Sequence, residues 1–157
     1  MNGEYLRLTP GELARAIEDL GSAADLAEGA RGAEDEARYL STHKAWHAIA
    51  FLLERAAFPV DIVYGEEAFT QDDDWGLGPP RYLTADRVRI AADALAAVTY
   101  DTLTAGVDRA DLAQADIYPK IWDEPDSLEW VQAWYEPLVA FFADAARQGD
   151  AMLVWLS

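Results

Sequence analysis

The chain has 157 residues, 52% of them hydrophobic, with six Trp, seven Tyr and five Phe, so we expect one domain with a packed core. Twelve basic residues against 29 acidic ones give a net charge of −17, which argues against direct binding of nucleic acid or of anionic membranes. Cysteine is absent, and this excludes disulfides, thiolate metal sites and cysteine nucleophiles.

The first part of the chain predicts a short strand and then helices. Residues 5–8 are typical of a strand, and Thr9-Pro10-Gly11-Glu12 is a capping box with proline at the first helical position. Residues 21–39 are rich in Ala, Gly and Glu and predict a loop or an exposed, loosely held helix. A further helix is expected from residue 41 or 42 to about residue 57, before Pro59.

The middle of the chain begins with a connection rich in glycine and proline, from residue 60 to residue 80. Residues 81–83 then predict a second short extended segment, and Thr84 is expected to cap a helix that ends near Val98. Short helical turns are expected at residues 100–105 and 109–115.

The last part predicts one long helix and a terminal strand. Asp126-Ser127-Leu128-Glu129 is a second capping box, the helix that it opens ends at Gly149, and residues 151–156 are apolar. The terminal strands need each other because a short strand alone leaves its backbone groups without partners. The sequence therefore predicts one domain over residues 1–157 whose elements are mostly helices, with a small sheet that includes the N- and C-terminal strands.

Both histidines, His43 and His47, are four residues apart in a predicted helix, a spacing similar to the zinc-protease pattern H-E-x-x-H. Lys44 stands where that pattern has its catalytic glutamate, so zinc-protease chemistry is excluded. Glu54 lies roughly 10 Å beyond His47 along the helix axis, too far for a third ligand. We therefore expect no stable zinc here and no cofactor, and we interpret the histidines as the boundary of an amphipathic helix.

Other motifs of catalysis or ion binding are incomplete. Counted from Asp72, the sixth and twelfth positions of an EF-hand loop hold Leu77 and Leu83 instead of glycine and glutamate. Gly76-Leu77-Gly78-Pro79 lacks the following G-K-[ST] of a phosphate-binding loop. The sequence also has no nucleophile elbow and no dinucleotide-binding fingerprint. No recognisable catalytic motif therefore indicates an enzyme.

Several short motifs, taken in order, resemble the YfbM-like family of bacterial proteins, a family of unknown function. These motifs are Lys44-x-Trp46, the segment 81–84 after a Gly-Pro loop, Ile117-Tyr118-Pro119 with Trp122, and the Ala-rich helix before the C-terminal strand. Family members usually carry an acidic residue where this chain has His43, which further weakens the idea of a histidine pair. The resemblance covers nearly the whole chain and implies a compact α+β fold without an established activity.

The matching segments hold polar and aromatic side chains that a core does not require. Lys44 and Arg81 would place positive charge beside aromatic rings and so hold an anionic or planar group. Alternatively, both cations pair with acidic neighbours and cover the rings with their stems. The candidate ligand-binding residues are Lys44, Trp46, His47, Arg81, Tyr82, Tyr118 and Trp122.

Two functions remain open. The first is a module that binds a basic protein, for instance an immunity-type protein that masks a cationic toxin. The second is a small-molecule enzyme or sensor that uses a pocket of Lys44, His47, Arg81 and Tyr118, in which His47 carries protons near neutral pH. The acidic charge also has a compositional interpretation, because the chain is rich in Ala, Asp, Glu and Arg and has only two lysines.

Two loops combine carboxylates with an aromatic residue and are the expected face for a basic partner. The candidate residues of this face are Asp72, Asp73, Asp74 and Trp75 in one loop, and Asp123, Glu124 and Asp126, beside Trp122, in the other. Because the chain starts without an apolar signal core and its longest apolar runs are about a third of a membrane span, we expect a cytoplasmic protein.

Overall fold

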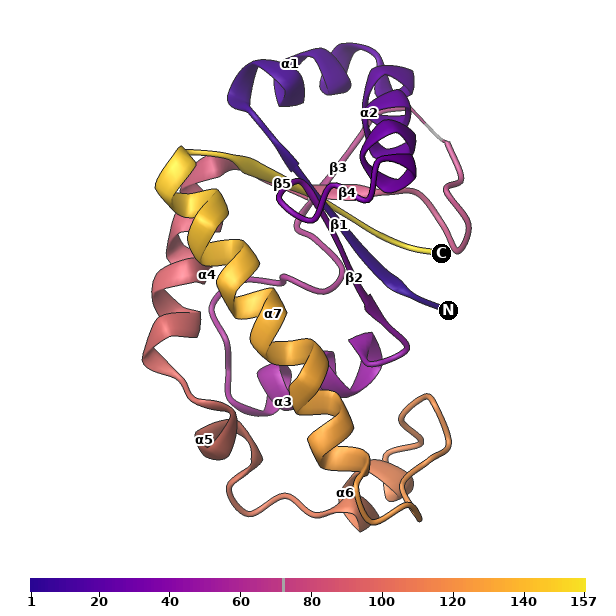
Figure 1. The fold of residues 1–157 in the computed structure, drawn as a ribbon, viewed down its shortest axis with the longest axis vertical. Helices are drawn as coiled ribbons and strands as arrows, with labels where there is room; N and C mark the ends of the chain where they lie inside the picture. The colour runs from indigo at the N-terminus through magenta and orange to yellow at the C-terminus, as the bar shows by residue number, and fades with distance from the viewer. Residues whose placement is uncertain (72) are drawn as a thin grey trace.

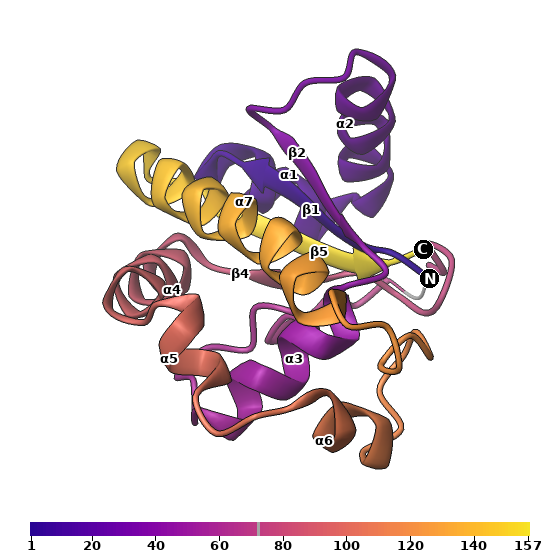
Figure 2. The same cartoon turned by 60° about the horizontal axis from the view of Figure 1, so that its bottom comes forward.

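The computed structural model describes residues 1–71 and 73–157 and contains a five-stranded antiparallel sheet with helices on both faces (Figures 1 and 2). The strands, in the spatial order β2-β1-β5-β4-β3, are β1 (Gly3–Leu8), β2 (Tyr39–His43), β3 (Glu67–Ala68), β4 (Arg81–Leu83) and β5 (Ala151–Leu156). The helices are α1 (Pro10–Glu18), α2 (Leu20–Gly32), α3 (Trp46–Arg55), α4 (Ala85–Ala97), α5 (Tyr100–Thr104), α6 (Arg109–Gln114) and α7 (Ser127–Gln148). The predicted α+β class is confirmed.

The two terminal strands form the centre of the sheet, as the sequence predicts. β1 and β5 pair in antiparallel register from Gly3 opposite Leu156 to Leu8 opposite Ala151. Beyond them, Asn2 and Ser157 exchange two backbone hydrogen bonds of 2.7 and 3.0 Å. Both ends of the chain therefore lie side by side (Figures 1 and 2).

The sheet separates two apolar clusters because successive side chains of a strand point to opposite faces. Leu6, Leu8 and Trp155 face α1 and α2, where the contacting residues of α2 are mostly alanines. Tyr5 and Val154 face α3, α4 and α7 on the other side. α1 and α2 thus form one layer, and the remaining helices form the other (Figure 2).

Most helix boundaries agree with the sequence. Thr9 forms its predicted capping box, Thr84 accepts a hydrogen bond from the backbone of Arg87, and Gly149 ends α7 in the left-handed region with φ of 70°. α7 also begins where it is predicted, but the expected capping box does not form, because Asp126 makes no capping hydrogen bond. No helix in the described ranges is long and apolar enough to span a bilayer.

In the first third of the chain one prediction is partly right and another is wrong. Residues 20–32 form a helix, which is one of the two structures that the sequence predicts, but this helix is regular and its alanine face is buried against the sheet. Residues 39–43 are strand β2 and not the start of a helix, because their backbone pairs with β1. The close approach explains Gly3: a Cβ atom there would lie 2.6 Å from Thr42 Oγ1 and 2.7 Å from Trp46 Cβ.

Candidate functional site

The structure separates the two histidines that the sequence places on one helix. His43 ends β2 with φ of 48°, and its ring lies 4.3 Å from that of Trp134 in α7. His47 lies in α3, where its Nδ1 accepts a hydrogen bond of 2.9 Å from the backbone N–H of Tyr118. The helical spacing on which a metal pair depends is therefore absent. Within the described residues, no group of three or more His, Cys, Asp or Glu side chains could hold a metal ion.

Three predicted ligand-binding residues do come together in an aromatic cluster of Trp46, His47, Tyr64 and Tyr118. The ring of Trp46 stacks on His47 at 5.0 Å and lies 6.1 Å from Tyr64 and 6.2 Å from Tyr118. Burial lowers the pKa of His47 below its ordinary value of 6.5, so the neutral ring that accepts the Tyr118 hydrogen bond is favoured.

The polar atoms at this cluster mostly serve the fold. Trp122 is buried, contrary to the expectation of an exposed anchor, and its Nε1 donates to the carbonyl of Ile117 at 2.8 Å. Trp46 is also buried, and its Nε1 has no acceptor among the described residues. Lys44 is exposed and forms no ion pair with any described residue.

Arg81 and Tyr82 lie on opposite faces of β4 and do not form one site with each other. Arg81 donates to the carbonyls of Gly65 and Glu66 at 3.2 and 2.6 Å, and a Cβ atom on Gly65 would lie 2.7 Å from Arg81 Cβ. Tyr82 packs on Phe69 with ring centroids 4.8 Å apart. Arg81 therefore has a structural role, because its hydrogen bonds hold the preceding loop in place.

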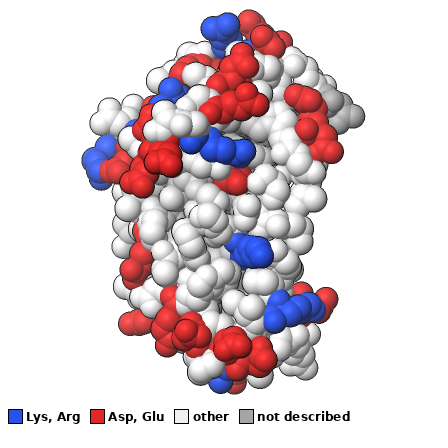
Figure 3. All heavy atoms as spheres, turned by 45° about the vertical axis from the view of Figure 1, so that its right-hand side comes forward, with Lys and Arg blue, Asp and Glu red and all other residues white. Residues whose placement is uncertain are grey.

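The two acidic loops expected to form one partner face lie apart along the long axis of the molecule (Figure 1). Figure 3, which brings the right-hand side of Figure 1 forward, shows acidic groups toward both ends of the molecule and a largely uncharged band between them. Asp73, Asp74 and Trp75 belong to one loop, and the exposed Asp123, Glu124 and Asp126 belong to the other; Asp72 lies outside the described residues. The two loops thus do not make a continuous surface.

In the first of these loops the side chains are partly used by the loop itself. Asp74 Oδ1 accepts backbone hydrogen bonds of 2.9 and 3.0 Å from Gly76 and Gly78, which lower the pKa of Asp74. The ring of Trp75 packs edge-on against Trp155 at 5.2 Å. Turn formation and core packing therefore give Asp74 and Trp75 structural roles in this loop.

A different site lies along the free edge of β2, in a groove of about 1010 Å³ between the end of α2 and α7. We call it the β2 groove. Its lining is Asn2, Glu4, Arg31, Glu34, Asp35, Glu36, Tyr39, Leu40, Ser41, His43, Trp134, Pro137, Ala140, Phe141, Asp144 and Ser157. Sequence reasoning missed this site, because its residues come from both termini, α2, β2 and α7. The local signal is weak: Glu4 is an acidic residue next to the alternating apolar residues of the first strand.

The floor of the β2 groove holds a buried carboxylate. Glu4 is 4% exposed, and its two oxygens accept hydrogen bonds of 2.6 Å from Tyr39 Oη and 2.8 Å from Ser157 Oγ. Burial, and to a smaller extent the hydrogen bond to Glu4, raises the pKa of Tyr39 to about 12. The guanidinium of Arg31 lies over the Tyr39 ring at 5.4 Å and reaches Glu4 at only 4.0 Å.

The two walls of the groove differ in chemistry. One wall is acidic and consists of Glu34, Asp35 and Glu36, which follow α2; Glu34 and Glu36 have no ion-pair partner in the described part of the chain. The other wall is the α7 face with Trp134, Pro137 and Ala140, which share one side of the helix because they are three residues apart. Pro137 and Ala140 are exposed and Trp134 is half-buried.

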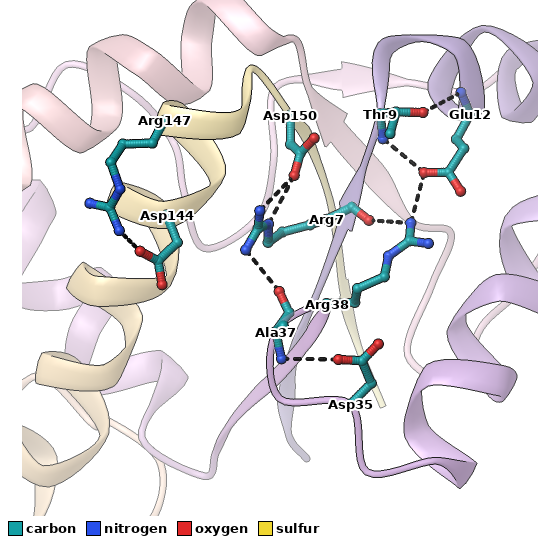
Figure 4. Close-up of polar contacts among 9 residues, drawn as sticks. All are labelled: Arg7, Thr9, Glu12, Asp35, Ala37, Arg38, Asp144, Arg147 and Asp150. Atoms are coloured by element: carbon teal, nitrogen blue, oxygen red, sulfur yellow. Dashed lines mark hydrogen bonds and ion pairs between the residues drawn. The ribbon is translucent and has the colours of Figure 1, made fainter.

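Hydrogen bonds fix the loop that carries the acidic wall (Figure 4). Arg7 bridges Asp150 and the carbonyl of Ala37, each at 2.9 Å. Arg38 binds the carbonyl of Arg7 at 2.8 Å and Glu12 at 2.7 Å. These contacts connect the loop to β1, α1 and the end of α7, so the groove is formed before any partner arrives.

Comparisons with known proteins show the family and the fold. A family model described as a domain of unknown function (DUF1877) matches residues 1–155. The chain is also similar to a solved structure described as the crystal structure of a protein of unknown function, YfbM from Escherichia coli, with 20% identity, a TM-score of 0.70 and 98% of each chain covered. No curated protein matches the chain. At this identity, the structural likeness supports the fold alone.

Proposed function

Because the chain belongs to the DUF1877 family, whose function is unknown, we propose a function from the β2 groove: the chain is a binding module that receives a basic segment of another protein. The observation that carries this proposal is the combination, in one preformed groove, of a buried carboxylate floor, an acidic wall and an exposed apolar wall. A cationic side chain would be held by the carboxylates while an apolar neighbour packs on Trp134.

The global charge of the chain supports the same partner. At −17 the protein attracts cations over about 8 Å at physiological ionic strength, which raises the rate of encounter with a basic partner. Among the described residues, Arg31 is the one arginine or lysine that lines the groove, and its side chain is about half exposed and only 4.0 Å from Glu4. Masking of a cationic protein by an immunity-type module is one form of this function.

The test uses two double variants that change the net charge equally. Glu34→Lys with Glu36→Lys alters the β2 groove, and Asp123→Lys with Glu124→Lys alters a distant exposed loop; each pair raises the net charge from −17 to −13, two units for each substitution. Binding of a lysine-rich peptide is measured by isothermal titration calorimetry at physiological salt. We expect the groove pair to weaken binding about tenfold or more, and the loop pair to have a smaller effect.

If the two pairs weaken binding equally, only the overall charge matters and the groove proposal is wrong. Circular dichroism of both variants controls for folding, and folding should persist because all four substituted residues are exposed. A repeat at high salt separates the screened long-range attraction from contacts inside the groove.

A small-molecule site at the aromatic cluster is the second candidate, and one observation favours it. The buried Nε1 of Trp46 lacks an acceptor among the described residues, and such a donor costs about 1–3 kcal/mol until it is satisfied. A ligand that supplies this acceptor would raise the Tm of the natural protein and leave that of Trp46→Phe unchanged. A screen of small carboxylates and amides by thermal shift decides this alternative.

A further inference from the structure

Strand β2 is the edge of the sheet that faces the groove. Among the described residues it pairs with β1 on one side and with no strand on the other. An edge strand offers unpaired backbone N–H and C=O groups, which are a template for another strand.

The hydrogen bonds fix which residues of β2 turn outward. The backbone N–H of Arg7 donates to the carbonyl of Arg38, so in the antiparallel register Leu40 also turns toward β1. Tyr39 and Ser41 turn away from β1, and the N–H of Tyr39 in fact donates to Asp35. The N–H of Ser41 and the carbonyls of Tyr39 and Ser41 therefore point into the groove.

We propose that the basic segment binds as a sixth strand along β2, by backbone hydrogen bonds to Tyr39 and Ser41. This inference rests on the proposed function and adds the manner of binding and the sequence pattern of the segment. The groove of about 1010 Å³ lies along this edge, where an added strand would pair at about 4.8 Å.

The two walls then contact alternate residues of the added strand. In β2, Tyr39 packs toward the α2 layer and Leu40 toward the α7 layer. Successive residues of an added strand alternate in the same way, so one set faces the acidic wall and Glu4, and the other faces Trp134, Pro137 and Ala140. The segment that fits is therefore one in which basic and apolar residues alternate.

Charge decides between this partner and a second copy of the chain. Pairing of two copies through β2 would bring two acidic walls together within two molecules that each carry a charge of −17, whereas a basic segment neutralises the wall. The occupant of the edge is therefore a basic strand from another protein.

The first experiment uses an alternating lysine–valine peptide and two N-methylated forms, one methylated at every lysine and the other at every valine. With the lysines toward the acidic wall, the direction of the peptide determines which of its N–H groups face β2. The lysine N–H groups face β2 if the peptide runs antiparallel to β2, and the valine N–H groups face β2 if it runs parallel. By fluorescence anisotropy we expect one methylated peptide to bind at least about tenfold more weakly and the other to bind as the parent does.

The second experiment changes the protein. Ser41→Pro removes an N–H that turns away from β1, so the sheet is retained, while peptide binding should fall at least about tenfold. Ser41→Ala is the matched control, because it removes only the hydroxyl that accepts from His43 N–H and keeps the outward N–H. The loss of binding in Ser41→Pro is therefore measured relative to Ser41→Ala.

The outcomes separate the two proposals. If the parent peptide binds through the groove and methylation of either set has the same effect, strand addition is overturned and the proposed function stands. If the parent peptide does not bind, both are overturned. Self-association that Ser41→Pro abolishes, without peptide binding, would show that a second copy occupies the edge and would also overturn the inference.

Discussion

The aromatic cluster around Trp46 and the β2 groove contain the same kinds of side chain and use them differently. In the cluster, His47 accepts from the backbone of Tyr118, and the neighbouring Trp122 donates to Ile117. In the groove, Glu34 and Glu36 of the acidic wall stay exposed, and so does Pro137 of the opposite wall. The carboxylates of Glu34 and Glu36 thus remain exposed for a partner, whereas the polar atoms of His47 and Trp122 are used within the fold.

The largest expected effect is a loss of stability when a tryptophan beside the aromatic cluster is removed. Trp122→Ala removes a buried indole and the hydrogen bond to Ile117, and it should lower the free energy of unfolding by about 3–5 kcal/mol. Urea denaturation measures this loss. Peptide binding per folded molecule should not change, and a loss of binding in fully folded Trp122→Ala would show that the two regions are coupled.

The second effect concerns binding at the groove. Trp134→Ala removes the half-buried aromatic residue of the apolar wall, and the affinity for the alternating peptide should fall by about 2 kcal/mol, or roughly thirtyfold. Gln132→Ala, on the same helix outside the groove lining, is the control. Calorimetric titration of both variants checks the prediction, which fails if both bind equally well.

A smaller effect is expected in the pH dependence of stability. The folded state lowers the pKa of His47, so this residue contributes stability above about pH 6.5 that is lost as the pH falls through the lowered value. His47→Gln retains a side-chain acceptor for Tyr118 but does not titrate in this range. It should therefore lose less stability than the natural protein between about pH 7 and pH 5.

The control for that measurement is His43→Gln, at the exposed histidine that packs on Trp134 outside the aromatic cluster. Urea midpoints of the three proteins across the pH range give the comparison. Equal pH dependence in His47→Gln and in the natural protein would show that the hydrogen bond to Tyr118 does not depend on the neutral ring.

The smallest expected effect is a gain in affinity for the peptide. Arg31 is the basic residue among those that line the groove, and it lies near Glu4 and over Tyr39. Arg31→Ala should strengthen peptide binding by about 0.5–1 kcal/mol, or roughly two- to fivefold, because a competing cation is removed. Arg89→Ala, an exposed arginine paired with Asp86 on α4, causes the same change in charge and should have less effect in the same titration.

Much of the fold follows from local sequence. The capping box at Thr9, the cap at Thr84 and the glycine at 149 determine where helices begin and end, because the groups that satisfy the helix termini are close in the sequence. The pairing of the terminal strands also follows, since two short apolar strands each need a partner. The family resemblance adds the α+β class.

The structure of residues 39–43 could not be predicted from local signals. Ser41 and Thr42 favour a helix start, yet pairing with β1 makes this segment a strand, since hydrogen bonds to a distant strand outweigh a local cap. The same strand pairing separates His43 from His47 and makes β2 an edge strand of the sheet.

The sequence by itself determined the acidic charge, the capped helices, the absence of recognisable catalytic motifs and the two terminal strands. Only the tertiary structure decided which polar atoms remain available. Burial of Trp122, the role of Arg81 at Gly65 and the contact of Glu4 with Ser157 join residues far apart in the chain. No local pattern records such contacts, because they arise from the packing of distant elements against one sheet.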